Sequence, residues 1–426
     1  MAFSSYAMTV SPRKSILLVA PAYSYRAVEY LQVANRLEIP LIWASDGAAN
    51  IYDKRYSGFR VDFKNCDESV SQIVNRVNES NITVVIAPDE KFVELAAAIA
   101  AELKLPHNTP EAIRRATNKH LSRQSLKKSG LPVPEFCLMN LHSSSDSLSL
   151  DIAYPCVIKP VNMSASRGVI RADNPRQFAE AIERINLLLQ QEFGDDCERA
   201  VLIEQYVAGS EHAFEGYLEN QVLQHICIFD KPDPLHGPYF EETYYVTPSR
   251  LEQSLQHRIS HVVQKACVAL QLTTGPVHAE VRIDGSRIWI LEVAPRSIGG
   301  DCGHLFSMAT NLSLEEYIVR RQIDVHPPPI RFTCATGVLM IPVRQNGVLR
   351  RVEGVTNALN VENISEIRID IREGETMTKW PEGGKYPGYI FAKAETPQLA
   401  EKALRQAHDC LKFVCFPQLP VEVQSR

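Results

Sequence analysis

Two glutamates, Glu280 and Glu292, lie on adjacent predicted strands that flank an Asp-Gly turn signal. Strand side chains alternate between two faces, so Glu280 shares a face with His278 and Arg282. A two-residue turn would place the glutamates on opposite faces, whereas a three-residue loop at 284–286 places them on one face. We expect the three-residue loop because it separates polar from apolar side chains. It gathers an apolar core face of Ala279, Val281, Ile283, Trp289, Leu291 and Val293.

This arrangement makes the two glutamates diagonal neighbours, roughly 7–8 Å apart at the backbone. Two carboxylates at that separation are suited to hard cations, and Mg2+ is usually bound by one or two carboxylates together with substrate phosphates. Arg296 follows Glu292 by four residues and is expected to meet the charge that such cations attract. Beyond it, Gly299 and Gly300 offer unencumbered backbone N–H groups that suit an anion. The alternative is a solvent-facing hairpin without a ligand.

A lysine and a loop of small residues precede the hairpin in the chain. Lys159 closes an apolar strand predicted at 156–160, where a lysine is costly without a partner. The segment that follows, 162–169, is rich in small residues that let backbone N–H groups approach an anion. We expect its contacts to come from Ser164, Ser166 and Gly168.

The order of these features resembles the ATP-grasp superfamily. The chain has Lys119 at the start of a predicted helix, then Lys159, the small-residue loop, an acidic strand end, two glutamates and Arg296. The resemblance implies that the lysines and the loop contact the phosphates of ATP, although Lys119 alone could equally be a surface lysine. It implies that Glu280 and Glu292 bind two Mg2+ ions, with Mn2+ as an alternative. It also implies an adenine-reading hinge of Glu204, Gln205, Tyr206 and Val207, and a ribose contact at Glu211.

A narrower resemblance concerns the substrate. The segment 238–248 is aromatic, acidic and bounded by prolines, and it resembles the E-x-G-H-x-x-P segment of the amino-acid ligase branch. Glu242 takes the acidic position and would hold a substrate ammonium, while Tyr244 and Tyr245 replace the glycine and the histidine. An ordered loop with stacked tyrosines is the alternative. Ala294 stands where many members have asparagine, which removes a common metal ligand.

The resemblance implies an ATP-dependent carboxylate-amine ligase, similar to L-amino acid ligases. Such an enzyme forms an amide or peptide bond through an acyl phosphate and releases ADP and phosphate. Lys159, Arg296 and His278 are then the catalytic residues, and His278 either deprotonates the amine or orients a glutamate. The substrates implied are a small carboxylate and an amine, both expected to be amino acids. The substrate contacts would be Glu242, Tyr245, His278, Arg296, Gly299 and Gly300.

Two other activities stay open at this point. One is a carboxylase-like or formate-activating ATP-grasp enzyme of nucleotide metabolism, although the chain has no biotin-carrier M-K-M motif. The other is a non-catalytic ATP-binding regulator. The presence of both lysines, both glutamates and Arg296 argues against the regulator.

Composition limits the partners and the compartment. The net charge of −5 and the pI near 6.2 give no electrostatic reason to expect a nucleic acid or an anionic membrane. No apolar run approaches the ~20 residues of a spanning helix. Ten cysteines without a C-x-x-C pair, and a polar stretch at 1–14 without a signal-peptide core, indicate a cytoplasmic protein. A homodimer is expected from the resemblance alone.

The pattern of elements predicts an α/β chain of three parts. Strands at 15–20, 41–44 and 82–87 alternate with helices, which indicates a Rossmann-like N-terminal domain at 1–107. It lacks a G-x-G-x-x-G fingerprint and is therefore not read as a dinucleotide site. The resemblance implies a two-part ATP-grasp domain at 108–325. Three prolines at 327–329 indicate a linker, and the resemblance implies a small α+β lid domain at 326–426.

Overall fold

The computed structural model describes residues 14–47, 57–78, 80–141, 153–161, 163–194 and 199–417. The N-terminal part is a parallel sheet in the order β3-β2-β1-β4, flanked by helices. Alternate residues of β1 face opposite layers: Leu17 packs with α2 and α3, and Leu18 packs with α1. The elements are β1 (Ser15–Val19), α1 (Tyr25–Arg36), β2 (Leu41–Ser45), β3 (Ser57–Arg60), α2 (Cys66–Val77), β4 (Ile82–Ile86), the 3-10 turn η1 (Glu90–Phe92) and α3 (Val93–Glu102).

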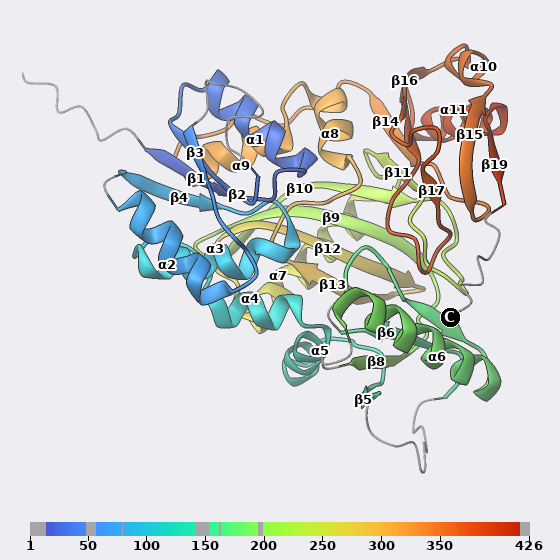
Figure 1. The fold of residues 1–426 in the computed structure, drawn as a ribbon, viewed down its shortest axis with the longest axis horizontal. Coiled ribbons are helices and arrows are strands. Elements are labelled where there is room, and N and C mark those ends of the chain that lie inside the picture. Colours follow the sequence, from blue (N-terminus) through green and yellow to red (C-terminus); the bar gives the residue numbers. More distant parts are fainter. Residues whose placement is uncertain are drawn as a thin grey trace, which may run out of the picture.

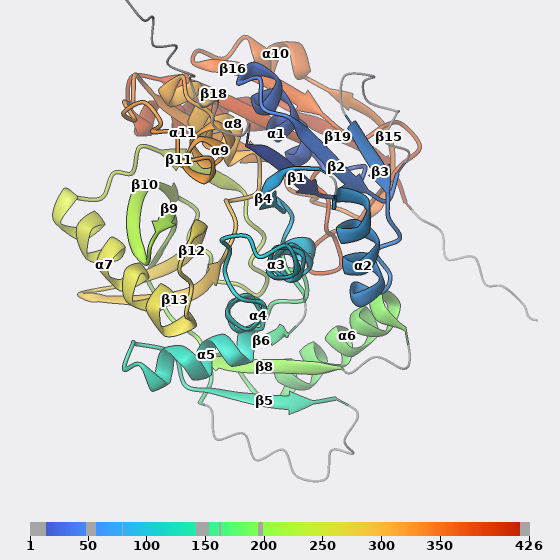
Figure 2. The ribbon, with the colours of Figure 1, turned by 90° about the vertical axis from the view of Figure 1, so that its left-hand side faces the viewer.

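A second, antiparallel sheet has the order β5-β8-β6-β7 and carries α6 on one face. Figure 2 shows this layer at the base of the molecule, below the large sheet. Helix α5 starts at Lys119 because Asn118 caps it, its side chain accepting from His120 and Leu121 N–H. The elements are α4 (Pro110–Thr117), α5 (Lys119–Lys128), β5 (Phe136–Asn140), β6 (Cys156–Pro160), β7 (Ile170–Ala172), α6 (Pro175–Phe193) and β8 (Ala200–Gln205).

The largest sheet has eight strands in the order β13-β12-β9-β10-β11-β14-β18-β16. It runs from the middle of the molecule toward the C-terminal elements (Figure 1). Its helices and strands are β9 (Ser210–Glu219), β10 (Val222–Lys231), β11 (Tyr244–Thr247), α7 (Gln253–Leu270), β12 (Gly275–Asp284), β13 (Arg287–Ala294), α8 (Cys302–Thr310), α9 (Leu314–Gln322), β14 (Ala335–Met340), β16 (Ile364–Ile369), β18 (Gly388–Ala394) and α11 (Pro397–Cys410).

The C-terminal segment contributes strands to the central sheet and also forms a small separate sheet. Strands β14, β18 and β16 extend the central sheet across the proposed boundary at residue 326, so that boundary stays a prediction. A small sheet lies beside them in the order β17-β15-β19. Its elements, with the neighbouring helix, are β15 (Gly347–Glu353), α10 (Val355–Leu359), β17 (Thr376–Met377) and β19 (Lys412–Phe416). No helix among the described residues is both long and apolar enough to cross a membrane.

The hairpin β12–β13 corrects the register expected from sequence. Asp284 pairs with Arg287, so the turn has two residues, 285–286, and the three-residue loop is wrong. A β-bulge between Glu280 and Val281 then shifts the register by one residue. As a result Glu280 lies directly opposite Glu292 rather than diagonal to it. The prediction that the two glutamates share a face is nevertheless confirmed.

The same shift changes the core face. Trp289 pairs with Arg282 on the polar side, and Leu291 lines a cavity instead of the core. Ile288 and Ile290 take their places in the apolar cluster. The sequence pattern missed this exchange because apolar residues occupy both faces of β13, so alternation alone does not select a register.

Candidate active site

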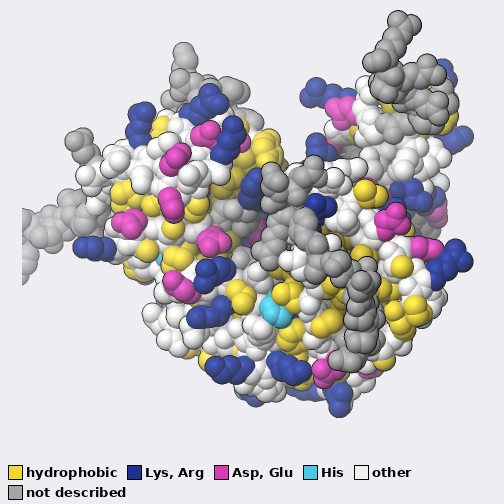
Figure 3. Space-filling view, turned by 60° about the horizontal axis from the view of Figure 1, so that its bottom comes forward, with side chains coloured by type: hydrophobic (Ala, Val, Ile, Leu, Met, Phe, Trp, Pro, Cys, Tyr) yellow, Lys and Arg dark blue, Asp and Glu magenta, His cyan; other side chains and the backbone are white. Residues whose placement is uncertain are grey.

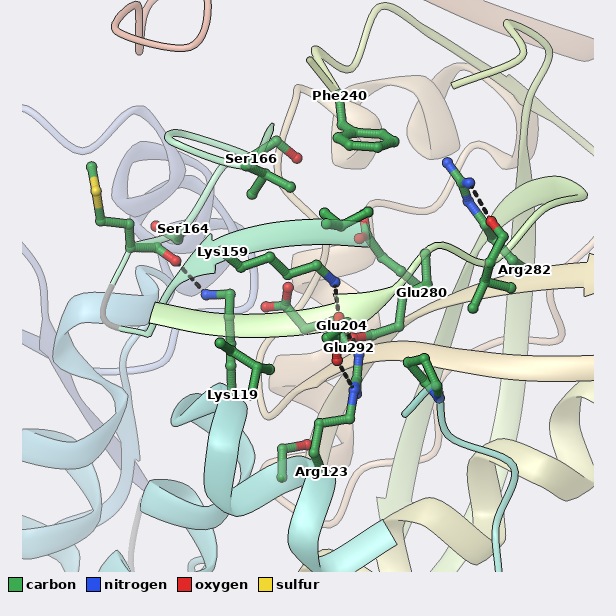
Figure 4. Close-up of a pocket in the computed structure, with 18 of the residues that line it drawn as sticks. Lys119, Arg123, Lys159, Ser164, Ser166, Glu204, Phe240, Glu280, Arg282 and Glu292 are labelled. Atoms are coloured by element: carbon green, nitrogen blue, oxygen red, sulfur yellow. Dashed lines mark hydrogen bonds and ion pairs between the residues drawn. The ribbon is translucent and has the colours of Figure 1, made fainter. Parts of the chain in front are cut away.

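A cavity lies between the four-stranded sheet β5-β8-β6-β7 and the β12–β13 hairpin, where β6 and β8 face the two glutamates (Figure 4). It brings together side chains from α5, β6, β8, β9, β12 and β13. Most of the expected nucleotide and metal contacts line it: Lys119, Lys159, Ser164, Ser166, Glu204, Gln205, Tyr206, Val207, Glu211, Glu280 and Glu292. The remaining expected residues lie outside that lining: Gly168, Glu242, Tyr245, His278, Arg296, Gly299 and Gly300.

Lys159 has a carboxylate partner in the structure. Its Nζ lies 2.5 Å from Glu204 Oε2, and Arg123 donates to the other oxygen of the same carboxylate. Burial by itself would raise the pKa of Glu204, but Arg123 and Lys159 lower it to about 2. Arg123 also donates to the Leu291 carbonyl at 2.6 Å, which ties α5 to the hairpin. The sequence argument that Lys159 needs a partner is thus met by Glu204, and any role on phosphate stays a proposal.

Glu204→Gln should make the free energy of unfolding fall less steeply as the pH is lowered. The pKa of Glu204 in the folded state, about 2, lies below the usual 4.5 of a glutamate, so this pairing stabilises the protein above pH 4.5, and the stabilisation is lost as the pH falls toward 2. The difference corresponds to about 3 kcal/mol. Urea unfolding between pH 5.5 and 3 should show a shallower loss of stability for Glu204→Gln, and no such change for the exposed control Glu102→Gln. Equal slopes for all three proteins would contradict the assignment.

The small-residue loop lies beside Lys119, whose Nζ donates to the Met163 carbonyl. Ser164 and Ser166 face the cavity, whereas Gly168 does not. The Gly168 N–H donates to the Pro381 carbonyl at 3.3 Å, and a Cβ at this position would meet Pro160 at 2.8 Å. Gly168 therefore has a packing role, and its expected phosphate contact stays a prediction. Asn162, also in the expected segment, lies outside the described residues.

Lys231, which the sequence analysis missed, joins three carboxylates beside the cavity. Its Nζ lies 2.7 Å from Glu211 Oε1, 2.8 Å from Glu242 Oε1 and 2.7 Å from Glu280 Oε1. The three carboxylates offer oxygens within 4.8 Å of one another. Strand pairing explains the cluster, because Lys231 lies opposite Glu211 on β9, and β9 in turn pairs with β12.

The signal for Lys231 was present in the sequence. It is the last residue of β10 and follows a buried apolar run by one residue, Asp230, and a lysine so close to a buried strand needs a partner, as Lys159 does in β6. Burial would lower the pKa of Lys231, but the three carboxylates raise it well above its usual value. Burial raises the pKa of Glu242 to about 7 despite the ammonium, whereas Lys231 and then His278 overcome burial and lower the pKa of Glu280. The Lys231 ammonium therefore offsets the cost of burying a charge at Glu280 but not at Glu242.

Glu292 differs from Glu280 in having no ion pair within 4.0 Å among the described residues. It lines the cavity, and burial together with the nearby carboxylate of Glu90 raises its pKa. Two carboxylates that lie opposite each other, one of them short of positive charge, form a donor set that suits a hard divalent cation. The side chains present at this site therefore fit the Mg2+ expected from sequence.

Arg296 lies in a neighbouring cavity and not in the lining of the first one. Its Nε donates to Glu90 Oε2 at 3.0 Å, and its Nη1 donates to the Ser297 carbonyl. Glu90 begins η1 after the last strand of the N-terminal sheet, so this pair joins the N-terminal part to the hairpin. Sequence reasoning missed Glu90 because a separation of 206 residues leaves no local pattern.

His278 is held by a buried carboxylate. Its Nδ1 lies 2.6 Å from Glu215 Oε1, and Glu215, which is 1% exposed, also accepts from the Ile298 N–H. The other ring nitrogen lies 3.9 Å from Glu280 Oε1. The sequence left two roles open for His278, deprotonating the amine or orienting a glutamate, and this geometry supports the second.

Of the remaining expected substrate residues, Glu242 and Tyr245 lie against Lys231. Tyr245 donates to Glu242 Oε2 at 2.7 Å and so fixes that carboxylate. Gly300 has φ +62°, and a Cβ there would meet Met340 Sδ at 2.8 Å, so glycine is required at this position. Gly299 lies under the Tyr25 hydroxyl. These residues leave the backbone of the loop close to Tyr25 and Tyr245.

Charged side chains on the surface beyond the site are mixed. Figure 3 shows Lys and Arg interspersed with Asp and Glu over much of the face that it presents.

Known proteins share both the sequence features and the fold. Residues 152–304 match the ATP-grasp domain family, and residues 339–415 match L-amino acid ligase C-terminal domain 2. An uncharacterised protein of Sinorhizobium fredii is 25% identical over 95% of this chain and 84% of its own length. Dapdiamide A synthase of Enterobacter agglomerans is 22% identical over 80% of this chain and 82% of its own length.

Among solved structures, L-amino acid ligase from Bacillus licheniformis superposes with a TM-score of 0.83 at 22% identity. The match covers 96% of this chain and 100% of that one. The expected α/β fold of the ATP-grasp type is confirmed by this superposition.

Proposed function

We propose that this chain, in which residues 152–304 match the ATP-grasp domain family and residues 339–415 match L-amino acid ligase C-terminal domain 2, is an ATP-dependent ligase that joins a carboxylate to an amine, with ADP and phosphate as the other products. The observation that carries the proposal is the cavity in which Lys119 and Lys159 face the opposed pair Glu280 and Glu292. Cations and carboxylates on opposite walls suit a nucleotide phosphate chain bound together with divalent metal. We further propose that the substrates are amino acids, as the name of the structural neighbour L-amino acid ligase suggests.

The proposed reaction has two steps. An oxygen of the substrate carboxylate attacks the γ-phosphorus of ATP, the bond to the bridging oxygen breaks, and an acyl phosphate and ADP form. The amine nitrogen then attacks the acyl carbon, phosphate leaves, and the amine loses a proton as the amide forms. Both steps develop negative charge, which donors fixed in advance stabilise best.

Each residue of the site has a proposed part in these steps. Lys119 and Lys159 bind phosphate oxygens, and Lys159 would exchange its contact with Glu204 for one with the nucleotide. Glu280 and Glu292 would hold Mg2+, which when bound neutralises the phosphate oxygens. Arg296 would approach the transferring group from the Glu90 side. The hinge residues Glu204, Gln205, Tyr206 and Val207 would bind adenine, and Glu211 would bind the ribose.

The amine would be bound by the carboxylate that Tyr245 fixes. Burial raises the pKa of Glu242 to about 7. Such a carboxyl exchanges a proton readily near neutral pH, which suits it to the ammonium-to-amine conversion that attack requires. His278 keeps an orienting role on Glu280, because its Nδ1 is already bound to Glu215. The Gly299 and Gly300 backbone would receive the acyl group.

Phosphate release from Mg-ATP with a matrix of amino acids, singly and in pairs, tests the proposal. We expect release that depends on two amino acids, or on another carboxylate and amine, together with an amide product detected by mass. Bicarbonate and formate serve as controls. Release with either of these alone, and none with any carboxylate-amine pair, would contradict the proposal and favour the carboxylase-like or formate-activating alternative.

A further inference from the structure

A second cavity of about 460 Å³ lies beside the loop that holds Gly299 and Gly300. Its walls come from α1, α8, α9, β16 and β18, and Ile298 and Asp301 of that loop contribute to it. It shares Tyr25, Asp370 and Tyr389 with a larger cavity of about 1030 Å³. The two cavities therefore adjoin, and the smaller one lies next to the backbone at which the acyl group is proposed to bind.

Negative side chains outnumber positive ones in this cavity. The lining has five carboxylates, namely Glu29, Asp301, Glu315, Glu366 and Asp370, and three basic residues, namely Arg26, His304 and Arg368. Two of the basic residues are paired with carboxylates: Arg368 with Asp301 and Asp370, and His304 with Glu366. Arg26 donates to Ser297, and its charge acts on Glu315 from beyond ion-pair distance.

Two carboxylates are left over. Among the described residues, neither Glu29 nor Glu315 has an ion-pair partner within 4.0 Å. Glu315 is only 7% exposed, and Gly303 makes room for it, since a Cβ there would lie 2.7 Å from its Oε1. Burial raises the pKa of Glu315 to about 7. A buried carboxyl in a cavity is costly to ionise unless a cation reaches it.

We propose that this cavity binds the cationic group of a substrate, an ammonium or guanidinium, between Glu29 and Glu315. The inference rests on the proposed function and narrows its substrate class to an amino acid or amine that carries a second positive charge. An ion pair with Glu315 would form in a largely desolvated wall, where a matched pair discriminates strongly against a neutral analogue.

The test compares a basic amino acid with a neutral analogue of the same length. Lysine and norleucine are supplied with each amino acid partner in turn, and kcat/KM for ATP-dependent phosphate release is measured. We expect lysine, or arginine in its place, to be favoured over norleucine by about tenfold or more. Glu29→Gln and Glu315→Gln should each reduce that preference by about tenfold, while the KM for ATP stays unchanged.

The exposed Glu102→Gln, which makes the same change of charge outside this cavity, should keep the preference for lysine. Glu29 is exposed, so Glu29→Gln remains informative if Glu315→Gln does not fold. Turnover of norleucine equal to that of lysine, or a preference that survives both substitutions, would overturn the inference and leave the proposed function standing.

Calorimetric titration with lysine and norleucine tests the cation-binding cavity independently of the ligase activity. Lysine binding that weakens in Glu29→Gln, without phosphate release for any pair, would confirm the cavity and contradict the ligase. If lysine does not bind but pairs of neutral amino acids release phosphate, the ligase would be supported and the cation-binding cavity contradicted.

Discussion

Replacing Glu292 by glutamine should lower kcat for ATP turnover by about a thousandfold. An amide keeps the size of the side chain but removes the negative charge that a divalent cation needs. Glu292 is a cleaner test than Glu280, because Glu280 also binds Lys231 and its loss would disturb that cluster. Glu292 has no ion-pair partner within 4.0 Å in the described part of the chain, so we expect its substitution to act on the proposed metal site alone.

Stability should not fall in Glu292→Gln. Burial and the neighbouring Glu90 raise the pKa of this carboxyl, so the neutral amide replaces a group that the fold holds charged only at a cost. We expect a melting temperature equal to or above that of the unsubstituted protein. Nucleotide binding measured without divalent metal should also be retained, and Glu102→Gln should behave as the unsubstituted protein in every assay. A kcat within tenfold of the original would contradict the metal role of Glu292.

Replacing Lys231 by methionine should destabilise the protein by about 3–5 kcal/mol at neutral pH. The ammonium is the ion-pair partner that Glu211, Glu242 and Glu280 share, and its side chain is 3% exposed. Without it, carboxylate oxygens within 4.8 Å of one another would repel in a buried site. Methionine fills a similar volume, so the loss would report charge rather than a cavity.

The pH dependence distinguishes this cause from simple misfolding. Lys231 lowers the pKa of Glu280, so its stabilising effect is present above the unfolded pKa of that group and is lost as the pH falls. In Lys231→Met the carboxyl pKa values rise instead, and protonation relieves the repulsion. The stability gap between the two proteins should therefore narrow as the pH falls from 7 to 5. Urea unfolding would show it, with the exposed Lys265→Met as control, and a gap that widens toward pH 5 would contradict the account.

The sequence predicted the individual strands and helices better than the pairing between strands. Strands β1, β2, β4, β6 and β8 were found because each is a short apolar run bounded by polar residues. The continuation of the central sheet through β14, β18 and β16 was not foreseen, since pairing between strands distant in the chain leaves no periodic signal. The bulge at Glu280 was missed for the same reason. The bulge depends on how β12 and β13 pair with each other and not on the sequence of either strand alone.

The site shows a similar limit. The glutamates, the first two lysines and the hinge were found from local patterns, and the cavity contains them. Lys231 carried the same signal as Lys159 and was overlooked. Glu90 and Glu215 could not be found, because their importance lies in contacts with Arg296 and His278 that only the folded chain creates.

The central claim is that a substrate carboxylate attacks ATP directly. Substrate amino acid labelled with 18O in its carboxylate tests it, with the released phosphate analysed by mass. The account predicts that one labelled oxygen appears in each phosphate formed together with the amide, because the acyl phosphate keeps the attacking oxygen on phosphorus. Phosphate without label would show that water had attacked ATP, and would contradict the account.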